Sequence, residues 1–338
     1  MNNVVESSFV TNVTQDRFIP KLVDNILAGN VLTMRLSRNR ARQWSSGHEI
    51  VQPTFIIAST TGGSYSGFDT FTTTQETKTD VAKFRISQLY WNVALSGRQL
   101  ALNQGESKVL DLVATEMDIA QKSLQDELGN QLYSDGTGNS NKDLLGLQAM
   151  VDDSTSVTTY GALSRSTYST WRATRTAQSG SLALSDLAAD FDAAQIGSDM
   201  PTLMITTPAA WTLYEALLTP TVSANFGVGE FRLTPEGGRS ISNLGGNQGF
   251  RALAFRGIPV VADEKCTSQN LYTLNENHIN WWNVSPDPTM GRSVNRGFQW
   301  TGFKEPVNQD GVAGQLLFYG QLTSDSPRTH ARRTGISS

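Results

Sequence analysis

The clearest hydrophobic pattern in the chain predicts one long helix between residues 106 and 133. Apolar side chains recur there at steps of three and four residues, which is the spacing of a single buried stripe on a helix. The stripe consists of Val109, Val113, Met117, Ala120, Leu124, Leu128 and Leu132. The opposite face is acidic and carries Asp111, Glu116, Asp118, Asp126 and Glu127. This face is either solvated or an electrostatic track for basic groups of a neighbouring molecule.

The region before the helix predicts a long polar β-hairpin over residues 44–95. Its first strand, 48–59, is rich in β-branched residues and contains Pro53, which favours an edge strand or a bulge. The glycine and serine content of 60–67 indicates the tip, and 71–95 alternates as a half-buried return strand does. Because a two-stranded ribbon is marginal by itself, we expect it to lie on another copy of the chain. Its basic residues Lys78, Lys83 and Arg85 are candidate partners for the acidic helix face.

Beyond the helix, alternating patterns predict an α+β fold. A helix is expected at 184–196, a buried strand at 201–206 and a helix from 209 to a stop at Pro220. Residues 221–249 are glycine-rich and lack periodicity. The remaining expected strands are 144–151, 155–159, 253–262, 271–275, 278–283 and a hairpin of 296–303 with 315–323, turning at 308–314. The basic residues 328–333 are expected to be peripheral.

Composition narrows the functional classes. The chain has 338 residues, enough for two connected domains, and a formal net charge of -4 with a pI near 5.5, which argues against a dedicated nucleic-acid binder. The single cysteine, Cys266, excludes an intrachain disulfide and is interpreted as a structural thiol. No apolar run is long enough to span a membrane and no secretory signal opens the chain, so we expect synthesis in the cytoplasm.

Catalytic and metal-binding patterns are weak. The three histidines, His48, His278 and His330, are scattered, and no common catalytic or nucleotide-binding motif occurs. The loop 135–143 resembles a calcium loop, but Ser140 and Gly146 stand where glycine and glutamate are required. We therefore predict no catalytic residue, no cofactor and no metal ligand, although an enzyme of unrecognised type remains an alternative.

One basic cluster is a candidate for contact with nucleic acid. Four arginines, Arg35, Arg38, Arg40 and Arg42, fall within a short stretch, and Arg328, Arg332 and Arg333 lie near the end of the sequence. Either group is suited to sequence-nonspecific contacts with DNA phosphates or to salt bridges between subunits.

Several strings, in the same order, resemble the major capsid protein of tailed bacteriophages, whose fold is shared with encapsulins. They are GLQAMVDD from residue 146, TYGALSRSTYSTWRA from 159, LMITTPAAWTLYEAL from 203, FRGIPVVADEKC from 255, LYTLNENHINWW from 271 and GQLLFYGQLTSDSPRTHARRTGI from 314. The resemblance extends over nearly the whole chain from about Phe18, and the order of arm, hairpin, long helix and α/β region agrees with it.

The resemblance implies a domain plan. Residues 1–43 would be the N-terminal arm, 44–95 the extended loop, 96–181 the peripheral domain with a spine helix at 103–133, and 182–255 the axial domain. Residues 256–338 would supply return strands of the peripheral domain and the C-terminus. Lys78 and Lys83 lie on the expected loop, but the asparagine and the glutamate of the cross-linking relatives are not matched residue by residue, so no lysine–asparagine cross-link is expected.

The resemblance also implies a function. The chain would self-assemble into pentamers and hexamers of an icosahedral head that encloses viral double-stranded DNA, and would be found in the virion after assembly in the host cytoplasm. Few residues precede the extended loop, so a separate scaffolding protein is expected. The other expected partners are a portal and decoration proteins. An encapsulin-like protein compartment is the alternative within the same fold.

Overall fold

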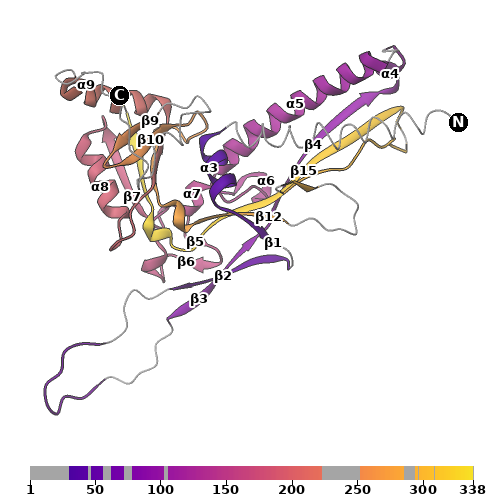
Figure 1. The fold of residues 1–338 in the computed structure, drawn as a ribbon. Coiled ribbons are helices and arrows are strands. Elements are labelled where there is room, and N and C mark those ends of the chain that lie inside the picture. Colours follow the sequence, from indigo (N-terminus) through magenta and orange to yellow (C-terminus); the bar gives the residue numbers. More distant parts are fainter. Residues whose placement is uncertain are drawn as a thin grey trace, which may run out of the picture.

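The computed structural model describes residues 30–44, 47–55, 62–71, 78–102, 106–222, 252–284, 294–295, 297–307 and 309–337. Two six-stranded sheets form the body, and a two-stranded ribbon and a long helix project from it in different directions (Figure 1). This mixture of helices and sheets confirms the predicted α+β class. Within the described part of the chain, no helix is both long and apolar enough to cross a membrane.

The first sheet is built around one long strand. Its order is β1-β12-β15-β14-β13, and β4 also pairs with β15. The strands are β1 (Ala41–Trp44), β4 (Ser87–Ser96), β12 (Ile279–Val284), β13 (Val294–Asn295), β14 (Phe298–Trp300) and β15 (Gly311–Ser324). β1 runs parallel to β12, and the other pairs are antiparallel. Beyond β12, β4 and β15 continue together as a long arm beside the helix (Figure 1).

The long helix α5 spans Glu106–Leu132, as its apolar stripe predicted, and follows the short helix α4 (Gly97–Leu102). Of the predicted stripe, Val113, Met117, Ala120, Leu124, Leu128 and Leu132 are buried, while the side chain of Val109 lies outside the description. The stripe packs toward β4 and enters the main core. The helix is therefore held along one face by the sheet that supports it.

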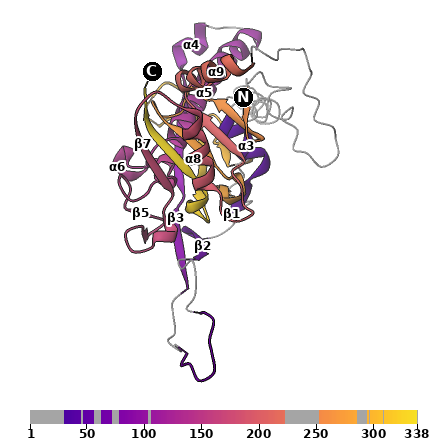
Figure 2. The same ribbon diagram turned by 90° about the vertical axis from the view of Figure 1, so that its left-hand side faces the viewer.

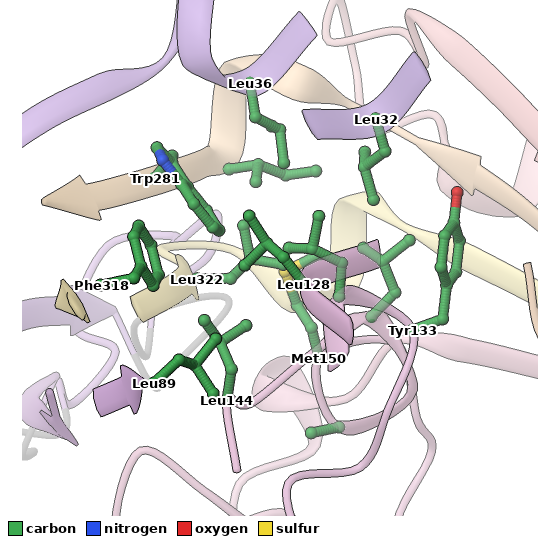
Figure 3. Close-up of a cluster of buried hydrophobic side chains, with 14 of the residues drawn as sticks. Leu32, Leu36, Leu89, Leu128, Tyr133, Leu144, Met150, Trp281, Phe318 and Leu322 are labelled. Carbon is green, nitrogen blue, oxygen red and sulfur yellow. The ribbon is translucent and has the colours of Figure 1, made fainter. Parts of the chain in front are cut away.

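The main core lies where α5, the first sheet and the helix α3 (Val31–Asn39) meet. Figure 3 shows Leu32 and Leu36 of α3 above Leu128, with Leu144 and Met150 on the opposite side. The rings of Trp281 and Phe318 stack in this core at a centroid distance of 5.6 Å. The last part of the predicted N-terminal arm thus packs on its own chain.

The second sheet has the order β7-β16-β11-β8-β10-β9. Its strands are β7 (Thr174–Gly180), β8 (Leu203–Thr206), β9 (Ala252–Phe255), β10 (Ile258–Ala262), β11 (Leu271–Leu274) and β16 (Ala331–Ile336), and the helices α8 (Leu184–Ala194) and α9 (Pro208–Val222) pack against it. Both faces are covered: Leu203 and Ile205 of β8 enter the main core, whereas Met204 enters a second core beneath the helices. Coverage on both sides explains why this strand reads as a continuous apolar run.

The later strands are divided between the two sheets. β12, β14 and β15 belong to the first sheet, whereas β10 and β11 pair with β8 on either side and β16 pairs with β11 in the second sheet. The predicted assignment of residues 256–338 to the peripheral domain stays a prediction. The expectation that residues 328–333 are peripheral is wrong for all of them except the exposed Arg328, because residues 329–333 are buried. Arg332 and Arg333 are each 4% exposed, and Arg333 binds both carboxylate oxygens of Asp190 at 2.8 Å.

Local predictions are wrong for several short segments. The predicted strand at 144–151 is instead the one-turn helix α7 (Leu147–Met150), preceded by Gly146, where a side chain would meet the Gln131 and Leu132 carbonyls at the end of α5. The predicted strand at 155–159 is a loop up to β5 (Thr159–Tyr160). α9 runs past its predicted stop at Pro220, and β15 begins at Gly311, inside the predicted turn.

Candidate assembly surfaces

The projecting ribbon consists of β2 (Glu49–Phe55) and β3 (Thr79–Arg85), paired from Glu49 with Arg85 to Phe55 with Thr79. Its side chains alternate: Ile50, Ala82 and Phe84 are buried, whereas Val51 and Val81 on the opposite face are 49% and 38% exposed. The predicted return strand 71–95 is divided at Ile86, after which β4 leaves the ribbon for the first sheet. The ribbon therefore does not stand entirely apart from the core, because its root belongs to it.

A second, smaller hairpin secures this root. β5 and β6 (Leu163–Ser164) are joined by Gly161 and Ala162, whose positive φ angles of 59° and 62° suit a tight two-residue turn. The Gly161 carbonyl accepts a hydrogen bond from the Lys83 backbone N–H at 2.9 Å. The Phe84 ring meets the Tyr160 ring at 5.0 Å, edge to face. The ribbon is thus fixed by both main-chain and aromatic contacts.

A fully buried arginine organises the loops beneath this hairpin. Arg165 is 0% exposed, and its guanidinium donates to the carbonyls of Ala149 and Met150 at 2.8 and 2.7 Å. It also donates to the carbonyls of Val157 and Trp171 and lies 5.0 Å from the Tyr160 ring centroid. Burial lowers the pKa of Arg165 to about 10, so the group stays charged at neutral pH. The sequence offers only an arginine-rich segment here and does not indicate a buried site.

The described part of the ribbon tip presents an exposed aromatic group. Tyr65, Phe68 and Phe71 are 67%, 106% and 66% exposed, and the rings of Tyr65 and Phe71 meet at 5.1 Å. Figures 1 and 2 both show residues 62–71 far from the two sheets. Exposed aromatic side chains gathered in one place are typical of interaction surfaces. We name Tyr65, Phe68 and Phe71 the tip aromatics.

The predicted basic partners on the ribbon differ in their surroundings. Lys78 and Lys83 are exposed. Arg85 donates from Nη2 to the Asp143 carbonyl at 2.9 Å, so its guanidinium is already engaged within the chain. Contacts of these residues with another subunit stay a prediction, and Lys78 and Lys83 are the more available of the three.

The acidic face of α5 is partly occupied by the chain itself. Asp126 forms an ion pair with Lys265, and its hydrogen bond raises the pKa of that lysine. Glu127 accepts a hydrogen bond from Gln131 at 2.8 Å. Asp118 is exposed and Glu116 is half-buried, while the side chain of Asp111 lies outside the description. An inter-subunit role for this face stays a prediction.

The cluster of four arginines is also largely engaged within the chain. Arg35 pairs with both carboxylate oxygens of Glu276, at 2.7 Å from Nε and 2.5 Å from Nη2. Arg40 donates to Asn277, and Arg42 lies over the Trp282 ring at 5.6 Å. Arg38 is exposed. DNA contact by this cluster stays a prediction and depends mainly on Arg38 and the outer face of Arg42.

The described residues provide little for catalysis. They contain no group of three or more histidine, cysteine, aspartate or glutamate side chains arranged to hold a metal ion. Cys266 is buried and unpaired, and burial raises its pKa well above the usual value, as expected of an inert structural thiol. Among the described residues, the notable groups of side chains lie at the ribbon root, at the tip aromatics and at the connections between the sheets.

Comparison with known proteins shows the fold. No protein-family model and no curated protein sequence matches the chain. The capsid of cyanophage A-1(L) superposes with a TM-score of 0.64 at 18% identity, over 89% of this chain and 91% of that chain. The holo-SrpI encapsulin complex from Synechococcus elongatus PCC 7942 gives 0.54 at 12% identity, over 89% and 87%. The capsid of a native GTA particle gives 0.53 at 12% identity, over 89% of both chains.

These structural neighbours are shell proteins, and the similarity covers most of each chain. The chain therefore has the major capsid fold that tailed phages share with encapsulins, as the resemblance of its sequence strings predicted. At these identities the comparison establishes the fold alone.

Proposed function

We propose that this protein is the shell-forming subunit of a phage head, assembling into pentamers and hexamers around double-stranded DNA. The observation that carries the proposal is the ribbon, whose root is fixed in the core while its tip exposes three aromatic side chains. An element of this kind gains little within its own chain, because the described tip is separated from both sheets. Contact with a neighbouring subunit supplies the burial that it lacks.

The division of the chain suggests how assembly proceeds. The two sheets share the main core and act as the rigid body, while the ribbon extends from one side as the clasp. A subunit that contacts several neighbours spreads the load over interfaces that together bury roughly 2,000 Å² or more. In this scheme residues 44–95 form the extended loop, and the second sheet with α8 and α9 forms the axial domain.

The partners follow from the same proposal. Scaffolding, portal and decoration proteins would complete the particle, and DNA would meet exposed cations such as Arg38 without reading sequence. An encapsulin-like compartment is the second candidate, supported by the similarity to the encapsulin complex. Copurifying nucleic acid or copurifying cargo protein distinguishes the two.

The test is assembly of the purified protein, alone and with a co-expressed scaffold candidate, by negative-stain electron microscopy and sedimentation velocity. We expect closed shells, tubes or rings of capsomers. A triple serine substitution of the tip aromatics, or deletion of residues 60–67, is expected to abolish them while leaving a folded monomer by circular dichroism.

Met200→Ser is the matched control, because Met200 is an exposed apolar residue, 53% accessible, beside the second sheet rather than on the ribbon. Shells of normal size from the triple variant would refute the role of the tip. A wild-type protein that stays monomeric in both conditions would refute the shell function itself.

A further inference from the structure

The chain passes between the two sheets at three places, and all three meet at His330. The first enters β7 at Thr174, the second joins β11 to β12 through η3 (Glu276–His278), and the third joins β15 to β16 through η5 (Pro327–Thr329). His330 accepts at Nδ1 from the Asn275 backbone N–H at 3.2 Å, and its carbonyl accepts from the Thr174 N–H at 3.2 Å. Its Nε2 lies 3.1 Å from Ser324 Oγ. His330 therefore contacts every crossing, two of them through its ring nitrogens and the first through its backbone carbonyl.

His330 must be neutral to make these contacts. Because Nδ1 accepts a hydrogen bond, the single ring proton lies on Nε2 and is donated to Ser324. The ring is completely buried, and this desolvation lowers its pKa to about 3. His330 is thus a buried, uncharged residue at the junction of the three crossings over the ordinary pH range.

A second histidine lies beside His330 in a different environment. His278 has a side chain 24% exposed and a carboxylate at each ring nitrogen. Nδ1 lies 2.8 Å from Asp325 Oδ1, at the end of β15, and Nε2 lies 3.3 Å from Asp199 Oδ2, in the turn between α8 and β8. The Asp325 backbone N–H also donates to the His278 carbonyl at 3.2 Å.

The two carboxylates decide which form of the ring fits. A neutral imidazole donates from one nitrogen only, so the other nitrogen would present its lone pair to a carboxylate oxygen. Only the imidazolium donates to both Asp325 and Asp199 at once. Because Asp325 is the nearer partner, loss of the proton leaves that bond in place and removes the one to Asp199.

We propose that His278 is a proton-controlled clamp between the two sheets. Its protonated ring ties the turn at Asp199, on the side of the second sheet, to the connection that leaves the first sheet at Asp325. Deprotonation releases the Asp199 turn and loosens the second sheet relative to the first. The clamp does not depend on shell formation, because every group in it belongs to one chain.

Other charged groups around His278 are already paired or neutral. Glu276, on the same short helix, is bound by Arg35 of α3, and Thr202 donates to its Oε2 at 2.9 Å. Arg40 donates to the amide oxygen of Asn277. His330 is uncharged. The two aspartates are therefore the charges that face the His278 ring without another cation between them.

The direction of the pH effect follows from these contacts. The hydrogen bond that His278 donates to Asp325, opposed by partial burial and supported by Asp199, raises the pKa of His278. A raised pKa means that the clamp stabilises the fold fully below about 6.5, the ordinary value, and loses this effect as pH rises through the higher folded value. His330 acts in the opposite direction at acidic pH, so a local measurement is needed to isolate the clamp.

Hydrogen exchange measured by mass spectrometry on the full chain reports the effect of the His278 clamp separately from that of His330. In the turn, the backbone N–H groups of Ile196 and Asp199 each donate to the other's carbonyl at 3.0 Å. After correction for the chemical pH dependence, we expect exchange in peptides covering 195–203 to accelerate by about threefold or more between about pH 6 and about pH 9. His278→Gln, which cannot carry the charge, should give a flat profile. His48→Gln, at an exposed histidine that makes none of the clamp's contacts, should keep the wild-type profile.

Asp199→Asn should have the opposite effect to deprotonation, because it should keep the turn protected at high pH. Its amide donates to the lone pair of a neutral imidazole. A wild-type profile in His278→Gln would overturn the proposal, and so would a wild-type profile in Asp199→Asn, which decides the matter if the glutamine variant does not fold. Protein that shows the clamp but never forms particles would refute the proposed function and leave this inference intact.

Discussion

The two ends of the ribbon differ in what holds them. At the root, Phe84 is 1% exposed and packs against Tyr160, whose hydroxyl accepts from the Ser324 backbone N–H at 3.1 Å. At the tip, Phe68 is 106% exposed. Both positions are aromatic and belong to the same polar ribbon. The difference shows that the root is specified by the chain's own core, whereas the tip is built for a surface that the single chain does not provide.

The root is also continuous with the connections between the sheets. Ser324, which binds Tyr160, also binds His330, and Thr54 of β2 donates to the Asp325 carbonyl at 3.2 Å. The direction of the ribbon and the arrangement of the sheets are therefore set by one contiguous group of side chains. A change at the root should affect stability, and a change at the tip should affect assembly.

The largest expected effect is at the root. Phe84→Ala removes a buried ring and its contact with Tyr160, so we expect the free energy of unfolding to fall by about 3 to 4 kcal/mol. Urea denaturation followed by circular dichroism measures it. Val51→Ala, on the exposed face of the same ribbon, should change stability by less than about 0.5 kcal/mol. Equal losses in the two variants would mean that the root is not packed as described.

The next largest effect is the dependence of stability on pH that arises from His330. The depressed pKa of His330, about 3, means that the folded state excludes a proton that the unfolded chain binds below about 6.5. Stability from this group is present above about pH 6.5 and falls as the pH is lowered toward 3. Between pH 7 and about pH 5 we expect a loss of about 2 kcal/mol, measured by denaturant titration. His330→Gln should flatten this loss; an unchanged slope would exclude His330 as its source.

A smaller effect is expected at the turn that supports the ribbon. Gly161→Ala places a Cβ 2.6 Å from Phe84 Cζ at a φ of 59°, so we expect a loss of about 1 to 3 kcal/mol. Gly197→Ala is the matched control, because Gly197 has a φ of 60° but nothing within 4 Å of the added carbon. The excess loss at Gly161 measures packing alone. No excess would show that the hairpin and the ribbon are not in contact.

The smallest effect on stability is at the tip. Phe68→Ser should leave the free energy of unfolding within about 0.5 kcal/mol of wild type, because the ring is already in solvent. The same variant should assemble poorly, which sedimentation velocity detects. A large loss of stability would show instead that the tip folds onto its own chain.

Hydrophobic patterns in the sequence predicted two of the buried elements. The stripe of α5 and the continuous apolar run of β8 were identified correctly, because each reports directly which faces are buried. The order of sequence strings also predicted the capsid fold. The predictions at 144–151 and at Pro220 were wrong, because a short apolar run does not distinguish a strand from a helical turn and a proline does not always end a helix.

The candidate sites were less predictable than the fold. Asp126, Arg85 and Arg35 were recognised as charges, but their partners Lys265, Asp143 and Glu276 are distant in the sequence. Arg165, His278 and His330 gave no signal as sites, because a buried arginine or histidine is distinguished from an exposed one only by its neighbours.

The sequence by itself therefore determined the apolar stripe and position of the long helix and the buried run that forms β8. Only the tertiary structure decided which strands share a sheet, which charges pair within the chain and where the three crossings converge. The physical reason is range: periodicity records the burial of a residue relative to its near neighbours, whereas strand pairing and ion pairing join residues that the chain brings together only on folding.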